Sequence, residues 1–354
     1  MDCEADLQAL DHLADPLFSQ LRRLDGTDGS EAEPVPVELI EAARSARARG
    51  GAAAWFAAEP CHHRLGKFEL VERLGAGSYG FVFLRARDLE LGRMVAIKIP
   101  RAGSLASKED AAQFLREARS AAQLKHPGIV SLHETGQAED GTFYLVEEFV
   151  PGTTLASVLG ARGQRLTFRQ AAELITAVAE AIDYAHRHGV IHRDIKPSNI
   201  LVDAEGQPHL MDFGLAKREA EETSMTEEGQ VLGTPAYMSP EQARGESRRV
   251  DARSDLYSLG VILYELLTGE RPFRGNRRML ILQVLEDEPR PPRQLNDKIP
   301  RDLETICLKA MAKSPPRRYA SARELADDLG RYLGGEPIHA RPIGRIERLR
   351  HWCR

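Results

Sequence analysis

His192-Arg193-Asp194-Ile195-Lys196-Pro197-Ser198-Asn199 is the stretch of this chain that decides its fold. Apolar, strand-like segments flank it, Val190-Ile191 before it and Ile200-Leu201-Val202 after it. The loop between them combines a carboxylate that can accept a proton, a lysine that can bind phosphate and an amide oxygen that can bind a metal ion. Asp212-Phe213-Gly214 follows and adds a second carboxylate for a metal. Phosphoryl transfer needs this set of groups.

The order and spacing of these residues resemble the eukaryotic-type (Hanks-type) serine/threonine protein kinases, in their bacterial branch. An HRD-like tripeptide alone is weak evidence, but Asn199 and Asp212 follow it at the family's spacing, and Lys196 is typical of the serine/threonine branch. The segments 237–242 and 335–342 resemble bacterial environmental kinases. The resemblance covers residues 68 to about 334. It implies an α+β fold with two lobes, a small antiparallel β-sheet lobe with one helix and a larger, mainly α-helical lobe.

The resemblance assigns a role to each polar residue of the loop. Asp194 orients the substrate hydroxyl and accepts its proton, and Lys196 steadies the γ-phosphate. Asn199 and Asp212 hold Mg²⁺, a hard cation that prefers oxygen ligands. Taken singly, such aspartates are often helix caps or turn residues. The number of suitable residues in the right order favours the catalytic interpretation.

Lys98 closes the motif Val95-Ala96-Ile97-Lys98 within the predicted strand 94–99, and the resemblance implies that it binds the α- and β-phosphates of ATP. A lysine buried at a strand end needs a carboxylate partner, because an unpaired buried charge is costly. Glu117, on the helix predicted for 108–124, is the preferred partner, and Glu109 near the start of that helix points elsewhere. Most Lys–Glu pairs are solvated surface pairs, so this prediction depends on the resemblance.

Gly75-Ala76-Gly77-Ser78-Tyr79-Gly80 is weak evidence alone, because a similar glycine pattern marks dinucleotide-binding folds. A helix would follow the glycines there, whereas here Phe81-Val82-Phe83-Leu84 alternates as a strand. We therefore expect a hairpin lid whose backbone N–H groups approach phosphates without a Cβ in the way. The full set of expected ATP contacts is Leu74, Gly75, Ala76, Gly77, Ser78, Tyr79, Gly80, Val82, Ala96, Lys98, Glu148, Val150 and Leu201.

The adenine ring is expected between apolar side chains of the two lobes, with backbone hydrogen bonds from Glu148 and Val150 at the hinge. Glu147 departs from the family, because the back of the pocket more often carries a hydrophobic residue or threonine. A carboxylate there must be hydrogen-bonded, exposed to water or protonated, and the sequence leaves all three open.

Arg193 beside the catalytic acid indicates control by an anion, which phosphate on a nearby loop usually supplies. Thr223, Ser224 and Thr226 are the candidates for autophosphorylation, which makes a second copy of the chain a candidate partner. The acidic residues of the same loop are an alternative partner for Arg193: Glu219, Glu221, Glu222, Glu227 and Glu228.

The segment 233–241 resembles the substrate-docking end of this loop in bacterial kinases. There Thr234 would bond Asp194 or Lys196 and favour a seryl or threonyl acceptor in a protein. Ser239 stands where many relatives have alanine. Two architectural contacts follow from the same resemblance: Glu241 pairs with Arg318, and Asp255 braces the backbone around His192.

The resemblance, together with the pattern of the chain, implies three parts: an N-terminal extension (1–66, partly helical or disordered), a kinase domain (67–334, with lobes 67–150 and 151–334) and a basic tail (335–354). Five strands and one helix are expected for 68–150. Apolar periodicity predicts long helices at 168–188 and 255–268. The tail's amphipathic face suits either an anionic membrane surface or packing against its own domain.

Composition excludes several other classes. With 354 residues, 42% of them hydrophobic and a net charge of −5, the chain has the make-up of an ordinary globular protein and no excess of positive charge for nucleic acid. Its cysteines, at 3, 61, 307 and 353, are too scattered for a disulfide framework, and Cys61-His62-His63 lacks a second cluster at zinc spacing. With no signal peptide or apolar span, a cytoplasmic location is expected.

Two rival functions remain on the sequence alone. A pseudokinase scaffold would hold nucleotide without transferring phosphate, but such proteins normally lack Lys98, Asp194 or Asp212, and all three are present. A small-molecule kinase of the same fold is the second rival, and the segment 233–241 argues instead for protein substrates.

Overall fold

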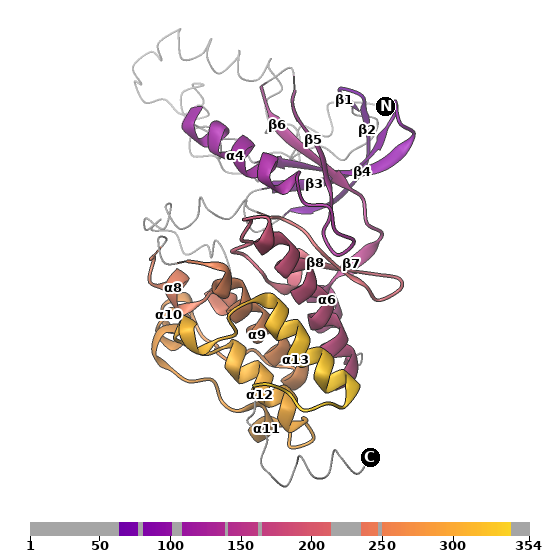
Figure 1. The fold of residues 1–354 in the computed structure, drawn as a ribbon. Helices are drawn as coiled ribbons and strands as arrows, with labels where there is room; N and C mark the ends of the chain where they lie inside the picture. The colour runs from indigo at the N-terminus through magenta and orange to yellow at the C-terminus, as the bar shows by residue number, and fades with distance from the viewer. Residues whose placement is uncertain are drawn as a thin grey trace, which may run out of the picture.

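The computed structural model describes residues 64–76, 81–100, 108–138, 141–161, 165–213, 235–246 and 250–340. These ranges form two lobes, a sheet with one helix beside it and a bundle of helices (Figure 1). Several predictions lie outside the described residues: the glycine-loop residues Gly77, Ser78, Tyr79 and Gly80, the phosphorylation candidates Thr223, Ser224 and Thr226, the docking residue Thr234, and most of both terminal extensions.

The smaller lobe is built on one antiparallel sheet with the strand order β1-β2-β3-β4-β6-β5. Its strands are β1 (Arg64–Leu65), β2 (Phe68–Ala76), β3 (Phe81–Asp88), β4 (Arg93–Pro100), β5 (Leu132–Gln137) and β6 (Phe143–Glu148). The five predicted strands are all present, and β1 adds a sixth just before them. The described sheet therefore starts at Arg64, and the Leu65 side chain is buried at its edge.

Period-two alternation explains this sheet, because successive side chains of a strand point to opposite faces. Val95, Ile97 and Ile99 of β4 are fully buried, and they form one core with residues of β2 and β3. Helix α4 (Lys108–Ala121) packs through Phe114 and Ala118 against Leu145 of β6. The lobe thus has an apolar cluster between helix and sheet, and the buried Lys98 lies on β4, next to β6 in the sheet.

The larger lobe is mainly helical. Its elements are α5 (Leu155–Gly160), α6 (Phe168–Arg187), α8 (Pro240–Ala243), α9 (Ala252–Thr268), α10 (Arg277–Glu286), α11 (Pro292–Leu295), α12 (Arg301–Ala310) and α13 (Ala322–Gly334). A three-stranded antiparallel sheet of β7 (Gly152–Thr154), β8 (Ile200–Asp203) and β9 (Pro208–Leu210) lies between these helices and the smaller lobe (Figure 1). Helix α9 is buried on nearly every side, as its continuous apolar sequence predicts.

Two helix ends differ from the predictions. Helix α9 begins at Ala252 instead of Asp255, because the Asp251 side chain caps it by accepting a hydrogen bond from the Arg253 N–H at 2.8 Å. Helix α4 ends at Ala121, whereas periodicity predicted an end at Leu124. Leu124 is buried, but in the core of the larger lobe. Its apolar character therefore reflects packing between lobes instead of continuation of the helix.

The two lobes are also joined through their backbones. Val130 donates to the carbonyl of Leu210 at 2.8 Å, and Leu210 donates to the carbonyl of Gly128 at 2.9 Å. These bonds form a short parallel bridge between the segment before β5 and strand β9. The bridge joins the smaller lobe to β9 immediately before the segment that carries Asp212.

Residues just beyond α13 pack against the domain. The buried carboxylate of Asp328 accepts backbone hydrogen bonds from His339 at 2.6 Å and Ala340 at 2.9 Å, and Ile338 is buried. The domain contacts therefore extend to the last described residues. Within the described ranges, every helix is too short or too polar to cross a bilayer.

Candidate active site

The loop 192–199 connects α6 to β8, and one buried carboxylate holds its start. Asp255 of α9 accepts hydrogen bonds from the backbone N–H groups of His192 at 2.9 Å and Arg193 at 2.8 Å. Arg193 has a φ of 67°, a left-handed conformation that is uncommon for a residue with a side chain. The two bonds to Asp255 offset the strain, so the predicted bracing role of Asp255 is confirmed.

His192 links this loop to the segment that carries Asp212. Its imidazole Nε2 lies 3.0 Å from the Met211 carbonyl, and its ring contacts the Phe213 ring with centroids 4.6 Å apart. The Met211 N–H donates to the Asn199 carbonyl at 3.1 Å. The two predicted motifs are therefore packed against each other, although twelve residues separate Asn199 from Asp212 in the sequence.

Asp194 is linked to Asn199 by hydrogen bonds and to Lys196 by an ion pair. The Asn199 Nδ2 donates to the Asp194 Oδ2 at 2.8 Å and to its carbonyl at 2.9 Å. The Lys196 Nζ lies 2.8 Å from the same Oδ2. Because the Asn199 amide nitrogen is turned toward Asp194, its Oδ1 faces the other way and suits a metal ion.

Asp212 follows β9 on the same lobe as Asp194 and pairs with Lys98 of the smaller lobe. Its Oδ1 accepts a hydrogen bond from Lys98, whose side chain is only 2% exposed. Asp212 also has a left-handed backbone, with a φ of 70°. Such conformations cluster at functional sites, where the surrounding structure holds them in place. Glu117, the predicted partner of Lys98, is half-buried on α4, and the Lys98–Glu117 pair stays a prediction.

The expected adenine contacts come from strands of both lobes. Leu74 of β2 is 46% exposed at the edge of the smaller lobe, while Ala96 of β4 and Leu201 of β8 are half-buried. The backbone of Val82 pairs with Ile99 and Ala76. The Glu148 N–H already donates to the Ser131 carbonyl at 2.8 Å, so a ligand can bond Glu148 only through its carbonyl.

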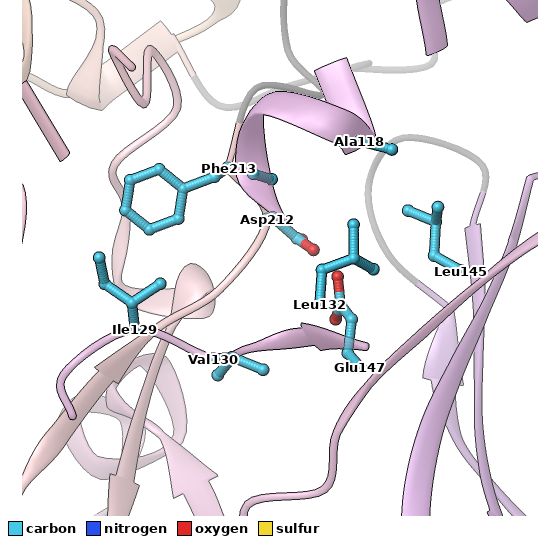
Figure 2. Close-up of a pocket in the computed structure, with 9 residues that line it drawn as sticks. Ala118, Ile129, Val130, Leu132, Leu145, Glu147, Asp212 and Phe213 are labelled. Atoms are coloured by element: carbon cyan, nitrogen blue, oxygen red, sulfur yellow. The ribbon is translucent and has the colours of Figure 1, made fainter. Parts of the chain in front are cut away.

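Glu147 is half-buried beside Asp212 at the rear of the cleft. Figure 2 shows both carboxylates directed into one pocket with apolar walls of Ile129, Val130, Leu132 and Leu145. The pocket has a volume of about 20 Å³, enough for one water molecule. Burial raises the pKa of Glu147 to about 7. The charge of Lys98 opposes this rise and that of Asp212 adds to it. Of the alternatives that the sequence left open, the apolar surroundings favour the protonated form and the nearby Lys98 favours the charged one, with burial the larger effect.

Arg193 contacts the segment 235–246 through its backbone carbonyl, while its side chain has a buried donor atom. The Gln242 Nε2 donates to the Arg193 carbonyl at 2.6 Å. The Arg193 Nε is buried, and among the described residues no group accepts its hydrogen bond. Sequence reasoning missed the Gln242 contact, because nothing in the spacing of the two residues indicates it.

Ser239, which replaces the alanine of many relatives, has a structural role here. Its side chain caps α8 by accepting from the Gln242 N–H at 3.4 Å, and the Gln242 side chain accepts from the Ser239 N–H at 3.0 Å. This reciprocal arrangement is a capping box, which the Ser-x-x-Gln spacing could have predicted. It also holds Gln242 in position to bond Arg193.

The predicted ion pair between Glu241 and Arg318 is confirmed. Two guanidinium nitrogens of Arg318 donate to the two Glu241 oxygens, at 2.7 and 2.8 Å, and Ser254 donates to the same carboxylate at 2.6 Å. Burial alone would raise the pKa of Glu241, but these donors lower it below the usual value. The pair lies in the core of the larger lobe and supports the segment that carries Gln242.

The two lobes, with Lys98, Asp194, Asn199 and Asp212 meeting between them, define the class as the bilobal protein kinase fold. The chain belongs to this family, since the protein kinase domain matches its residues 68–328. Among solved structures, the Mycobacterium tuberculosis PknI kinase domain superposes with a TM-score of 0.62 at 25% identity. That match covers 78% of this chain and 100% of the other.

The curated relatives are bacterial. The serine/threonine-protein kinase PknB of Mycobacterium leprae is 43% identical over 282 residues, covering 78% of this chain and 45% of that protein. The probable serine/threonine-protein kinase PknB of Bifidobacterium longum is 41% identical over 286 residues, with 78% and 41% covered. The chain thus spans less than half the length of these relatives.

Proposed function

We propose that this chain is an ATP- and Mg²⁺-dependent protein serine/threonine kinase, which transfers the γ-phosphate of ATP to seryl and threonyl hydroxyls of proteins. The observation that carries the proposal is the convergence of Lys98, Asp194, Lys196, Asn199 and Asp212 in one cleft. The names of its relatives support the same activity.

Each residue of the cleft has a task in this reaction. Asp194 orients the acceptor hydroxyl and accepts its proton. Lys196, bonded to the same carboxylate at 2.8 Å, is placed to stabilise negative charge on the phosphate being transferred. Lys98 binds the α- and β-phosphates. Positioning and charge stabilisation account for most of the catalysis, because phosphoryl transfer needs little covalent help from the enzyme.

The donor set suits magnesium. The Asn199 Oδ1 and the Asp212 carboxylate supply hard oxygen ligands, on segments that the Met211–Asn199 backbone bond ties together. When bound, the ion would neutralise charge on the phosphates. Lys98 would exchange its present bond to Asp212 for the nucleotide. The adenine would lie between Ala96 and Leu201, with backbone contacts at Glu148 and Val150.

A radiolabelled-ATP assay with a generic basic protein tests this function. Asp194→Asn should lower the rate at least about a thousandfold, as expected for loss of a catalytic base and orienting group. Lys98→Met is a second inactive control, and circular dichroism with thermal unfolding shows that each variant folds. Nucleotide binding without transfer by the parent would favour a pseudokinase scaffold. Phosphorylation of small alcohols but not of proteins would favour a small-molecule kinase.

We also propose activation by autophosphorylation at Thr223, Ser224 or Thr226, between two copies of the chain. The buried Arg193 Nε supports this, because among the described residues it has no acceptor and a phosphate would supply one. Phosphatase treatment should lower the activity, and a Thr223→Ala/Ser224→Ala/Thr226→Ala variant should be insensitive to it. Unchanged activity after complete dephosphorylation would leave the acidic residues of the loop as the partners of Arg193.

The proposed cytoplasmic location rests on composition. Scattered cysteines that form no disulfide framework fit a reducing compartment, and Cys307 is free and buried. The tail, where the sequence left membrane contact and self-packing open, lies mostly outside the described residues. Vesicle sedimentation with anionic lipid, comparing the full chain with one ending at residue 340, separates these alternatives.

A further inference from the structure

Glu147 lies on the strand next to Lys98 and on the same face of the sheet. Strands β4 and β6 are antiparallel neighbours in which Lys98 pairs with Leu145 and Ala96 with Glu147. Side chains two residues apart in a strand share a face, so Glu147 and Leu145 point to the side from which Lys98 extends. The position of Glu147 relative to Lys98 is therefore set by the hydrogen bonds of the sheet.

The acidic neighbours of Lys98 come from different elements. Asp212 bonds it directly, and Glu147 lines the same pocket as Asp212, with its carboxylate turned toward that group (Figure 2). Glu117 lies on α4, which packs over the sheet through Phe114 and Ala118. The pocket wall is otherwise apolar, and a low local dielectric strengthens the attraction between a cation and nearby carboxylates.

Asp212 cannot serve Lys98 and a metal ion equally well. The proposed function, on which this inference rests, requires Asp212 to bind magnesium during the reaction. Lys98 is 2% exposed, and a buried ammonium without a carboxylate is costly. When Asp212 turns to the metal, the phosphates of the nucleotide become the direct partners of Lys98. Carboxylates on neighbouring elements, Glu117 on α4 and Glu147 on the adjacent strand, would then orient the ammonium toward those phosphates.

We propose that Glu147 is a positioning residue for Lys98, a carboxylate on the adjacent strand that holds the ammonium in line with the phosphates when Asp212 is engaged by the metal. It works beside Glu117, so that Lys98 has one partner from the sheet and one from the helix. Loss of either carboxylate is then partly covered by the other.

A double-mutant cycle on the full chain tests this redundancy. Glu147→Gln and Glu117→Gln should each lower kcat/KM about tenfold, and together more than about a thousandfold, beyond the product of the single losses. The loss should fall mainly on kcat, while the Kd of ADP without metal changes less than about threefold, because Lys98 aligns phosphates more than it binds adenine.

Two further variants separate positioning from packing. Glu147→Asp keeps the charge and should recover most of the rate. Glu147→Leu fills the apolar pocket and should retain or raise the thermal stability but share the loss of Glu147→Gln. A packing role predicts the reverse order, with Leu active and Asp impaired.

The inference fails if Glu147→Gln is as active as the parent, or if the double variant loses only the product of the single losses. Asp194→Asn, assayed in parallel, distinguishes this failure from failure of the proposed function. If Asp194→Asn is inactive while Glu147→Gln is unimpaired, the kinase assignment stands and only the role of Glu147 is lost.

Discussion

Buried carboxylates behave in opposite ways in the two parts of this molecule. In the larger lobe, Glu241 accepts from Arg318 and Ser254, and Asp255 accepts from the backbone of His192 and Arg193 and lies 2.7 Å from His186. Burial acts to raise the pKa of each carboxyl, but these donors outweigh it and lower both values. At the rear of the cleft, burial prevails and raises the pKa of Glu147 to about 7.

The difference shows that the partners of a buried acid, more than its depth, decide its charge. The two acids of the larger lobe have all their donors on their own lobe. Glu147 shares one cation, Lys98, with another carboxylate, Asp212. Glu241 and Asp255, whose oxygens accept several hydrogen bonds, therefore stabilise the larger lobe. Glu147, which shares Lys98 with Asp212, lies instead at the proposed nucleotide and metal site.

The largest expected effect is on stability, through the buried ion pair between Glu241 and Arg318. Arg318→Ala leaves the Glu241 carboxylate buried without its main partner, and should lower the free energy of unfolding by about 3–5 kcal/mol. Urea denaturation measures it. Replacing both members by residues of similar size, Glu241→Gln with Arg318→Met, should cost much less, since no buried charge is left alone. Equal costs for the single and double variants would contradict this account.

Asp255→Asn is expected to have an intermediate effect. One carboxylate oxygen becomes an NH₂ group that faces backbone donors, so a hydrogen bond to His192 or Arg193 is lost, at about 1–3 kcal/mol. Because that bond holds the start of the catalytic loop, kcat should fall as well. Denaturation and steady-state kinetics check the two effects. Asp251→Asn, at the cap of the same helix, is the matched control and should leave kcat near the parent value.

Glu147→Gln should have the smallest effect on stability and the opposite sign. Its folded-state pKa of about 7 lies above the ordinary value of 4.5, so between these two values the folded form holds a proton that the unfolded chain releases. The free energy of unfolding therefore falls as pH rises through this window. Glu147→Gln removes this pH dependence. Relative to the parent, the free energy of unfolding of the variant should therefore be about 1–2 kcal/mol more favourable to the folded state at pH 8 than it is at pH 5.

Thermal unfolding at several pH values measures this difference. Glu148→Gln, whose side chain is exposed on the adjacent position, serves as the matched control and should change stability by less than about 0.5 kcal/mol at either pH. If Glu147→Gln and the parent have the same stability at every pH, the Glu147 carboxylate has donors as effective as those of Glu241 and Asp255. That result would contradict the difference between the two parts of the molecule.

Sequence reasoning reached most of the fold because the signals were local. The alternation of apolar residues in β4 and the uniformly apolar α9 are readable in the chain itself. It failed where a residue packs against a distant element. Leu124 continues the period of α4 but is buried in the other lobe. The capping box of Ser239 was readable from spacing, whereas the bond from Gln242 to the Arg193 carbonyl was not.

The order of residues along this chain determined which groups form the cleft. Asp194, Lys196 and Asn199 lie within six residues, so local backbone geometry nearly suffices to bring them together. The tertiary structure alone decided how the charges pair, with Lys98 on Asp212 and Glu147 in the pocket beside them. The physical reason is that charge pairing depends on distance and on the surrounding dielectric. Both are set by the packing of strands and lobes whose residues lie far apart in the sequence.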